Sequence, residues 1–442
     1  MARGMRFRHG VHPPELKELT AAVPIRRMPF PDEVVLPLSQ HTGKPAKPIV
    51  RAGDRVERGD MVADSDGFVS SPIHASAAGV VTGIDLWPHA SGTYQPAVRI
   101  AVAPYSAQVP RKRIIPEWQG LSREEVVEAV RHAGVVGLGG AAFPTHVKLV
   151  PPKDTAIDTI VINGCECEPY LTTDHRTMVE YPERVHLGTR LMMRALGVPR
   201  AMIGVENNKP DAIKALQATV PDDIDVTVHG LTVKYPQGAE KMLIKSLLDR
   251  EVPSGKLPMH VGVVVHNVAS VATIAEVFET GLPLVERIIT VTGPGVRRPS
   301  NLIAPVGSKV GDLVQACGGF TEDAREIVFG GPMMGAAVSG PEVPVMKGTS
   351  GVIVLTDAEV KSQKSYPCIQ CGHCLDACPV FLNPQMLGQL AKSDRYEEMV
   401  KEYHLMDCML CGCCGYTCPS NIPLTQLFAM AKNHLKKHPV AA

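Results

Sequence analysis

The chain has 442 residues, of which 45% are apolar, and its 45 basic and 45 acidic side chains give a formal net charge of +0. This length predicts about three domains with ordinary cores, and the balanced charge disfavours nucleic acid as a partner. No uninterrupted apolar run approaches the roughly 20 residues that span a bilayer, and the N-terminus lacks the apolar core of a signal peptide. We therefore expect a cytoplasmic chain with no transmembrane helix of its own.

After an N-terminal arm, residues 1–30, the segment 31–105 consists of short apolar runs separated by turns such as Gly53-Asp54 and Gly59-Asp60. Short strands between such turns predict a small all-β unit. Together with the run 73–81, these turns resemble the barrel-sandwich fold of biotinyl and lipoyl domains, which carry their cofactor on a hairpin lysine. Residues 63–111 contain no lysine, so we expect a biotinyl-like scaffold without a carrier lysine.

A helix is predicted next, because Ser122 and Glu125 form a capping box ahead of an apolar periodic stretch. We expect it to end near Gly134. Beyond it, β-like runs alternate with helical stretches, which predicts an α/β domain over residues 120–285. The β-like runs are 159–163, 201–205 and 226–228, and the helical stretches are 211–216 and 240–248. Residues 286–356 return to strands with one short helix and predict a β-grasp-like module.

A glycine-rich loop lies within the α/β domain, with Gly137, Gly139 and Gly140 ahead of Phe143 and Lys148. Residues without a β-carbon let backbone N–H groups approach a phosphate, and a lysine nearby can neutralise its charge. The loop follows a helix rather than a strand, and its spacing does not fit Gly-x-Gly-x-x-Gly. A Rossmann dinucleotide site is the weaker interpretation, and a helix cap joined to a turn stays open as a structural alternative.

The last segment, residues 360–442, repeats the pattern Cys-x-x-Cys-x-x-Cys-x-x-x-Cys-Pro twice. This is the bacterial ferredoxin pattern for two [4Fe-4S] clusters, in which the fourth cysteine of each motif binds the other cluster. The predicted ligand sets are Cys368, Cys371, Cys374 and Cys418 for the first cluster, and Cys408, Cys411, Cys414 and Cys378 for the second. Zinc or disulfides are the alternative, but zinc sites close at four ligands and do not favour a repeated run with a trailing proline. The segment is expected to be an α-helical ferredoxin-type domain.

Four segments resemble the FMN-carrying, NADH-oxidising subunit of respiratory complex I. The first is the glycine loop from Gly137 to Lys148, and the second is the run from Asn163 to Pro169, which is similar to that family's Asn-Ala-Asp-Glu-x-Glu-Pro. The third, residues 235–240, is similar to its Tyr-x-x-Gly-Glu-Glu, and the fourth, residues 266–268, is similar to its Asn-Asn-Val. The order of barrel-sandwich, flavin domain, β-grasp (SLBB) module and double ferredoxin motif is similar to the C subunits of the Rnf electron-transport complex.

The Rnf resemblance implies a peripheral NADH-oxidising subunit on the cytoplasmic face of the inner membrane. The implied cofactors are non-covalent FMN, NADH/NAD+ and the two clusters. The implied partners are ferredoxin and the membrane-embedded and iron–sulfur subunits of the same complex. A flavin and iron–sulfur cobalamin reductase, and an electron-wire subunit without a functional flavin, are the alternatives.

The resemblance also implies a role for each matched residue. Phe143 would stack on the nicotinamide, and Glu168 would contact NADH. The implied flavin-site residues are Gly137, Gly139, Gly140, Lys148, Asn163, Glu166, Gly238, Glu240 and Asn267. Three positions depart from complex I: Cys165 replaces an aspartate, Ala239 a glutamate and His266 an asparagine. The departures leave the exact hydrogen bonding of the flavin open.

Overall fold

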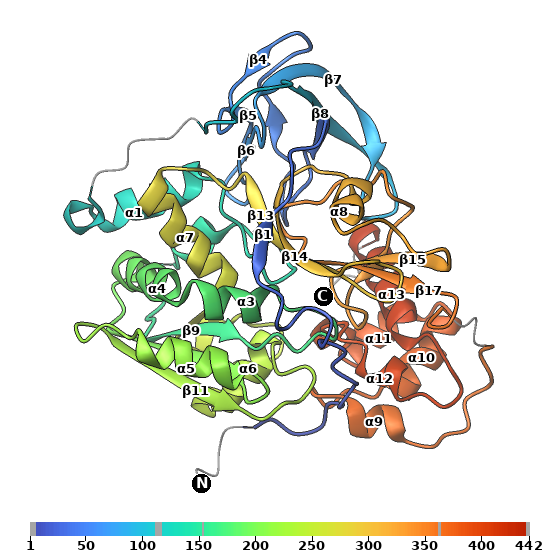
Figure 1. The fold of residues 1–442 in the computed structure, drawn as a ribbon. Helices are drawn as coiled ribbons and strands as arrows, with labels where there is room; N and C mark the ends of the chain where they lie inside the picture. Colours follow the sequence, from blue (N-terminus) through green and yellow to red (C-terminus); the bar gives the residue numbers. More distant parts are fainter. Residues whose placement is uncertain (1–5, 111–116, 153, 361–363, 439–442) are drawn as a thin grey trace.

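The computed structural model describes residues 6–110, 117–152, 154–360 and 364–438. Figure 1 shows four parts around an N-terminal arm: an all-β unit at the top, an α/β domain at the left, a mixed sheet at the right and a helical unit below that sheet. Residues 1–5 of the predicted arm, and 361–363 and 439–442 of the predicted cluster domain, lie outside the described residues.

Two small sheets form the all-β unit, with strand orders β2-β8-β7-β4 and β3-β5-β6. Apolar side chains from both sheets, including Val34, Val62 and Ile100, form a shared core because alternate residues of each strand point inward. The strands are β2 (Glu33–Pro37), β3 (Lys47–Pro48), β4 (Arg55–Val56), β5 (Met61–Asp64), β6 (Ile73–His74), β7 (Gly79–Pro88) and β8 (Tyr94–Val102).

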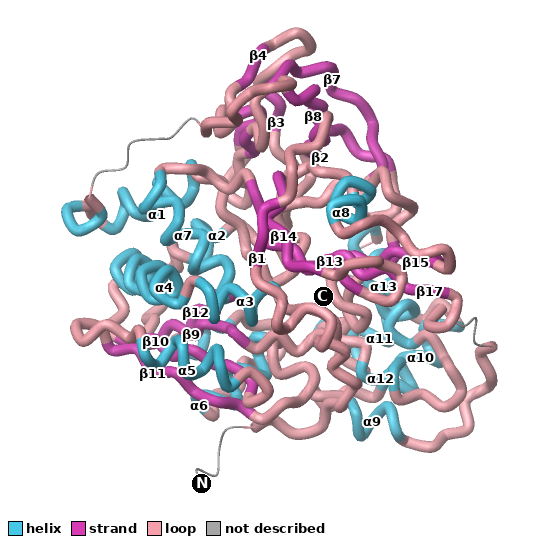
Figure 2. The backbone as a smooth tube through the Cα atoms, viewed as in Figure 1, coloured by secondary structure: helices cyan, strands magenta, loops and turns pink. Residues whose placement is uncertain are grey.

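The α/β domain is built on a parallel sheet with the order β11-β10-β9-β12. Its strands are β9 (Thr159–Gly164), β10 (Arg200–Glu206), β11 (Asp225–Leu231) and β12 (Val263–Asn267). Ile160 and Ile162 of β9 belong to the core on one face, and Val161 belongs to the core on the other. Helices cover the sheet, as Figure 2 shows. They are α1 (Arg123–His132), α2 (Thr145–Lys148), α3 (Thr173–Glu180), α4 (Pro182–Leu196), α5 (Pro210–Ala218), α6 (Glu240–Leu248) and α7 (Val268–Thr280).

The predicted capping box at the start of α1 is confirmed. The Ser122 side chain accepts from Glu125 N at 3.2 Å, and the Glu125 carboxylate accepts from Ser122 N at 2.7 Å. Gly134 follows the helix with a φ of +66°, a left-handed conformation that favours glycine and ends helices.

The mixed sheet has six strands in the order β1-β14-β13-β17-β15-β16. They are β1 (Ile25–Arg27), β13 (Glu286–Thr292), β14 (Ser300–Pro305), β15 (Ala324–Phe329), β16 (Ala336–Ala337) and β17 (Gly351–Thr356), with one helix, α8 (Val310–Ala316). β1 belongs to the N-terminal arm and pairs in parallel with β14. The arm is therefore a structural part of this sheet, which the sequence did not reveal.

Short helices form the cysteine-rich unit around a core that includes Leu387, Leu390, Met399 and Phe428. The helices are α9 (His373–Ala377), α10 (Pro384–Lys392), α11 (Tyr396–Lys401), α12 (Cys413–Tyr416) and α13 (Leu424–Lys437).

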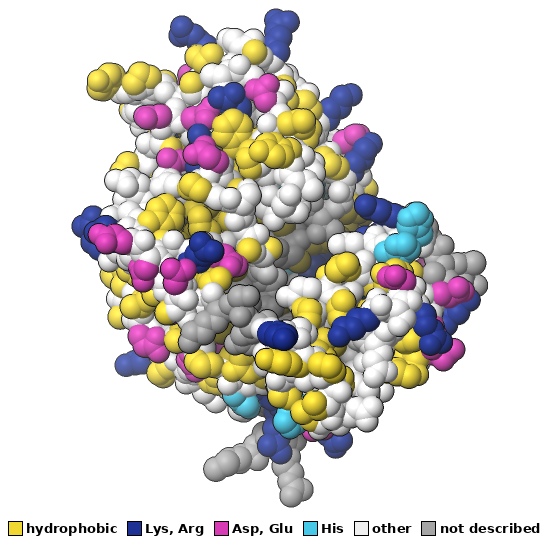
Figure 3. Space-filling model, turned by 90° about the vertical axis from the view of Figure 1, so that its right-hand side faces the viewer, with side chains coloured by type: hydrophobic (Ala, Val, Ile, Leu, Met, Phe, Trp, Pro, Cys, Tyr) yellow, Lys and Arg dark blue, Asp and Glu magenta, His cyan; other side chains and the backbone are white. Residues whose placement is uncertain are grey.

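On the face shown in Figure 3, lysine and arginine side chains are interspersed with aspartate and glutamate. No helix of the described residues is long and apolar enough to cross a membrane.

Candidate active site

Two asparagines mark the carboxyl edge of the parallel sheet. Asn163 of β9 and Asn267 of β12 are partners in the strand register. The chain runs outward from β9 to β11 and then returns to the other side of β9, and ligands of such sheets bind beyond the strand ends where the order reverses. Asn163 Nδ2 donates to Gly238 O at 2.8 Å, and Asn267 Oδ1 caps α7 by accepting from Ala269 N at 3.0 Å. The strand order thus places both predicted residues where a cofactor is expected.

The glycine loop lies against this edge. A β-carbon at Gly139 would come within 3.1 Å of Asn267 Cβ, and Gly140 has a φ of +104°, which side chains rarely tolerate. Gly137 N donates to Phe143 O at 2.8 Å and closes the loop. A side chain at 139 would press against Asn267, and one at 140 would strain the backbone.

Lys148 and Glu240 face each other across the same edge, with Lys148 Nζ 3.5 Å from Glu240 Oε2. Lys148 Nζ also donates to Val265 O at 3.1 Å. The two side chains remain 34% and 39% exposed, so the ammonium group is accessible to an anionic ligand. Nearby, a β-carbon at Gly238 would lie 2.4 Å from Cys165 O, which leaves room for no other residue.

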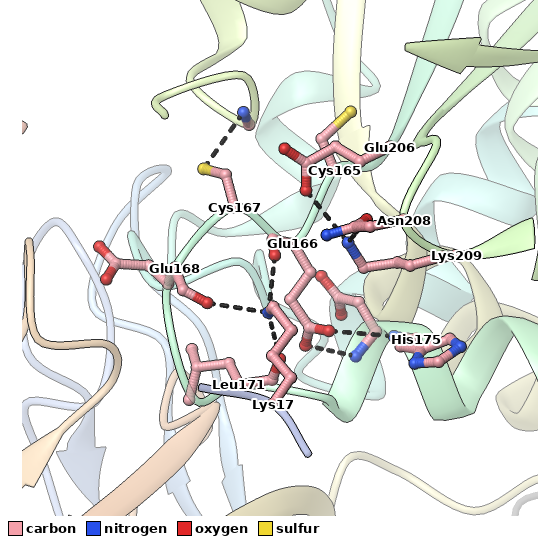
Figure 4. Close-up of polar contacts among 12 residues, drawn as sticks. Lys17, Cys165, Glu166, Cys167, Glu168, Leu171, His175, Glu206, Asn208 and Lys209 are labelled. Carbon is pink, nitrogen blue, oxygen red and sulfur yellow. Dashed lines mark hydrogen bonds and ion pairs between the residues drawn. The ribbon is translucent and has the colours of Figure 1, made fainter. Parts of the chain in front are cut away.

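Beyond β9, the chain forms an acidic loop, defined here as residues 166–171, that leads into α3. Figure 4 shows the Glu166 carboxylate directed at the start of α3. It accepts from Thr173 Oγ1 at 3.1 Å, from Asp174 N at 2.8 Å and from His175 N at 3.2 Å. The carboxylate therefore satisfies N–H groups that have no partner within the helix.

Glu168 joins the α/β domain to the mixed sheet. Its carboxylate accepts from Met333 N at 3.0 Å, and the Tyr235 hydroxyl oxygen lies 3.3 Å from Glu168 Oε1. Burial raises the pKa of Glu168, and these contacts oppose the shift. A β-carbon at Gly331 would lie 2.1 Å from Glu168 Oε2, so the mixed sheet closes tightly on this side chain.

Asp174 is a site residue that the sequence did not identify. It lines the cavity described below, and its carboxylate accepts from Asn267 Nδ2 at 2.6 Å. Burial raises the pKa of Asp174 to about 7, with a further contribution from the nearby Glu166 carboxylate. A single aspartate on a helix shows no sequence pattern that marks a binding site. Asp174 follows Glu166 by eight residues, and this short separation could have suggested that both belong to the same site once the loop between them was known.

All of the predicted flavin and NADH residues line a single cavity of about 760 Å³, a volume typical of small-molecule sites. They are Gly137, Gly139, Gly140, Phe143, Lys148, Asn163, Glu166, Glu168, Gly238, Glu240 and Asn267. Gly330, Met334 and Gly348 of the mixed-sheet module line it as well. A glycine loop, an accessible ammonium group and asparagine amides at a sheet edge fit a flavin nucleotide.

The eight motif cysteines gather in two groups, each drawn from both motifs. One hollow is lined by Cys368, Cys371, Cys374 and Cys418, and another by Cys378, Cys408, Cys411 and Cys414. Among the described residues, no three or more His, Cys, Asp or Glu side chains are arranged to hold a single metal ion. Burial raises the pKa of Cys378 and of Cys414, the latter to about 12, so these thiols need a cationic metal to become thiolates. Both groups fit the crossed ligand sets.

The second cysteine group adjoins this cavity. The Tyr235 hydroxyl donates to Cys411 O at 2.7 Å, and Met409 lines the cavity. Cys413 is fully buried beside Tyr235 and Cys411 in a small apolar cluster against which Cys167 packs. In contrast, Cys368 and Cys371 of the first group are exposed.

Four family profiles match consecutive parts of the chain. They are "RnfC Barrel sandwich hybrid domain" over residues 5–103, "Nuo51 FMN-binding domain" over 130–276, "SLBB domain" over 288–337 and "4Fe-4S dicluster domain" over 364–422. These matches confirm the predicted fold class, and the FMN-binding and dicluster domains assign FMN and [4Fe-4S] clusters to the chain.

Relatives that match nearly the whole chain include C subunits of ion-translocating complexes. The chain is 45% identical, over 91% of its length and 88% of the relative's, to the C subunit of the "Proton-translocating ferredoxin:NAD(+) oxidoreductase complex" of Clostridium ljungdahlii. It is 42% identical, over 89% of its length and 88% of the relative's, to the C subunit of the "Na(+)-translocating ferredoxin:NAD(+) oxidoreductase complex" of Acetobacterium woodii. The chain belongs to this family of C subunits.

Other matches agree with membership of this family. The C subunit of the "Ion-translocating oxidoreductase complex" of Rhodobacter capsulatus is 41% identical over 98% of the chain and 83% of its own length. Among solved structures, an NAD+-reducing [NiFe]-hydrogenase in the air-oxidized state has a TM-score of 0.50 and 21% identity over 64% of this chain and 55% of its own. That likeness concerns the fold alone.

Proposed function

We propose that this chain is the peripheral, NADH-oxidising subunit of a membrane-bound, ion-translocating electron-transport complex. It would carry electrons between NADH and ferredoxin or the partner subunits through FMN and two [4Fe-4S] clusters. The observation that supports this most strongly is the single cavity, which combines all the predicted flavin and NADH residues with Met409 of the second cysteine loop. A nucleotide site and a cluster site therefore share one wall.

Different side chains would bind different parts of the cofactors. Lys148 would neutralise a phosphate, and the two paired asparagines would hold the flavin at the sheet edge. Phe143 would stack on the nicotinamide and Glu168 would contact the NADH. When bound, FMN supplies the conversion between the two-electron chemistry of NADH and the one-electron chemistry of the clusters.

The positions of the cysteines support an order of electron transfer. The group with Cys411 adjoins the cavity, whereas Cys368 and Cys371 are exposed beside exposed apolar residues, of which Ile369 is 67% accessible. The cluster held by the first group would therefore pass electrons to a protein partner, and we call this group the electron exit. We place this exit on the cytoplasmic face of the membrane complex.

Anaerobic reduction of the reconstituted chain by NADH tests the function. With FMN and both clusters bound, NADH should reduce the clusters. Electron paramagnetic resonance measures the reduced clusters. The matched control is the same preparation without FMN, in which the clusters should stay oxidised. Clusters that NADH reduces equally well without FMN, or not at all with it, would contradict the proposal.

A further inference from the structure

The N-terminal arm brings a lysine to the back of the acidic loop. Lys17 Nζ donates to Glu166 O and to Glu168 O, both at 2.9 Å, and to Leu171 O at 2.5 Å. Figure 4 shows the side chain reaching between these three carbonyl oxygens. Lys17 is 8% exposed, and it lies far outside the segment matched by the FMN-binding profile, residues 130–276.

The three acceptors indicate a protonated amine. An ammonium group has three N–H donors, whereas a neutral amine has two, so three carbonyl acceptors are satisfied by the charged form. Burial lowers the pKa of Lys17, and the Glu166 carboxylate opposes that shift. Because all three acceptors are backbone oxygens, the ammonium fixes the course of the loop and also places a positive charge behind its carboxylates.

Other contacts hold the arm in place on both sides of Lys17. Val11 and Tyr235 exchange two backbone hydrogen bonds of 2.9 Å, and Tyr170 N donates to Glu15 O at 2.9 Å. Thr172 Oγ1 donates to Thr20 Oγ1 at 2.8 Å. The backbone of the arm is therefore anchored by contacts other than the lysine side chain, and we expect the arm to stay in place when that side chain is replaced.

The acidic loop carries two of the carboxylates that line the cavity and leads to a third. Glu166 holds the start of α3, where Asp174 lies, and Glu168 is fixed against Met333. Both residues are among the three whose carbonyl oxygens Lys17 binds. A change in the course of this backbone would move all three carboxylates together.

We propose that Lys17 is a positioning residue for NADH: its ammonium group holds the acidic loop in the shape in which Glu168 receives the dinucleotide. This inference rests on the proposed function and extends the site to the N-terminal arm. Lys17 acts through the loop and contacts neither substrate nor flavin.

The test compares Lys17→Met with the wild-type full chain, both loaded with FMN and clusters. Methionine has a similar length but no donor. The KM for NADH should rise about tenfold, because NADH binding must then order a loop that is no longer held in shape, at a cost of about 1.4 kcal/mol, while kcat with an artificial acceptor stays within about twofold. Hydrogen exchange of the amides in 166–171 should accelerate, and amides of the cysteine-rich unit should not change.

The matched control is Lys234→Met. Lys234 Nζ also links the arm to the α/β domain, by donating to Phe7 O at 3.3 Å, but it forms no hydrogen bond or ion pair with the described residues of the acidic loop. Its replacement should leave the KM for NADH and the exchange of 166–171 unchanged. Lys17→Gln, which keeps an amide donor without the charge, is measured in parallel and decides the result if the methionine variant does not fold.

Three results would overturn this inference: an unchanged KM and exchange rate in the folded Lys17 variants, an equal effect in Lys234→Met, or collapse of folding in both Lys17 variants. The last would make Lys17 a residue of the core rather than of the site. A wild-type chain that does not oxidise NADH would instead reject the proposed function itself, so the two failures are distinguishable.

Discussion

Replacing Lys148 by methionine should weaken the binding of FMN. Lys148 is the glycine-loop cation, and its Nζ lies 3.1 Å from Val265 O and 3.5 Å from Glu240 Oε2. A charge-assisted hydrogen bond contributes about 1.5–3 kcal/mol, or roughly ten- to hundredfold in affinity. Because the side chain is 34% exposed, water screens part of the attraction, and we expect a loss near the tenfold end of this range.

The neighbouring glutamate makes this prediction more specific. Without Lys148, the Glu240 carboxylate would face the FMN phosphate with no cation between them, and like charges repel. Glu240→Gln added to Lys148→Met should therefore restore part of the lost affinity. A restored affinity in the double variant would identify the charge of Lys148, rather than its packing, as the cause.

Fluorescence titration of the flavin-free protein with FMN measures the effect, and iron content checks that the cluster domain is intact. The control is Lys245→Met, on the same helix as Glu240, because Lys245 forms its ion pairs with the exposed residues Asp249 and Glu251. An FMN affinity in Lys148→Met equal to that of the wild type would refute the assignment of this lysine to the phosphate.

Three further outcomes are expected. Because burial raises the pKa of Asp174 from 3.8 to about 7, the folded state binds the proton more tightly than the unfolded state, and stability should fall as the pH rises from about 4 to 7. In the flavin-free protein, Asp174→Asn should therefore stabilise the folded state by roughly 3 kcal/mol more at pH 8 than at pH 5, seen as a larger rise in melting temperature, and an equal change at both pH values would count against this pKa. Cys418→Ala should abolish the cluster held by Cys368, Cys371 and Cys374 and spare the other, as paramagnetic resonance and iron content would reveal; loss of the second loop's cluster alone would contradict the crossed ligand sets. NADH should be preferred over NADPH by at least about tenfold in kcat/KM, because Glu168, Asp174 and Glu240 line the cavity and no arginine among the described residues does so; equal kcat/KM values in steady-state assays would refute this.

Local patterns in the sequence were sufficient for the elements whose signals lie close together along the chain. The capping box of Ser122 and Glu125 predicts the start of α1 because its two reciprocal hydrogen bonds form within one helical turn. Likewise, the spacing of the motif cysteines identifies candidate ligands because a tight loop brings neighbouring thiols together. The glycine loop is also a local pattern, whereas the run from Asn163 to Pro169 was identified by its resemblance to the complex I subunit.

Only the tertiary structure decided which distant residues hold the acidic loop beside the cavity. Lys17 reaches the acidic loop from 149 residues away, and Met333 N meets Glu168 over a separation of 165 residues. Neither contact leaves a periodic pattern, because each depends on how the arm, the α/β domain and the mixed sheet pack rather than on local backbone preferences. The reversal of strand order, which sets Asn163 beside Asn267, is likewise a property of the whole sheet. The sequence determined the chemical groups of this protein, and the packing of its parts determined which of them share one site.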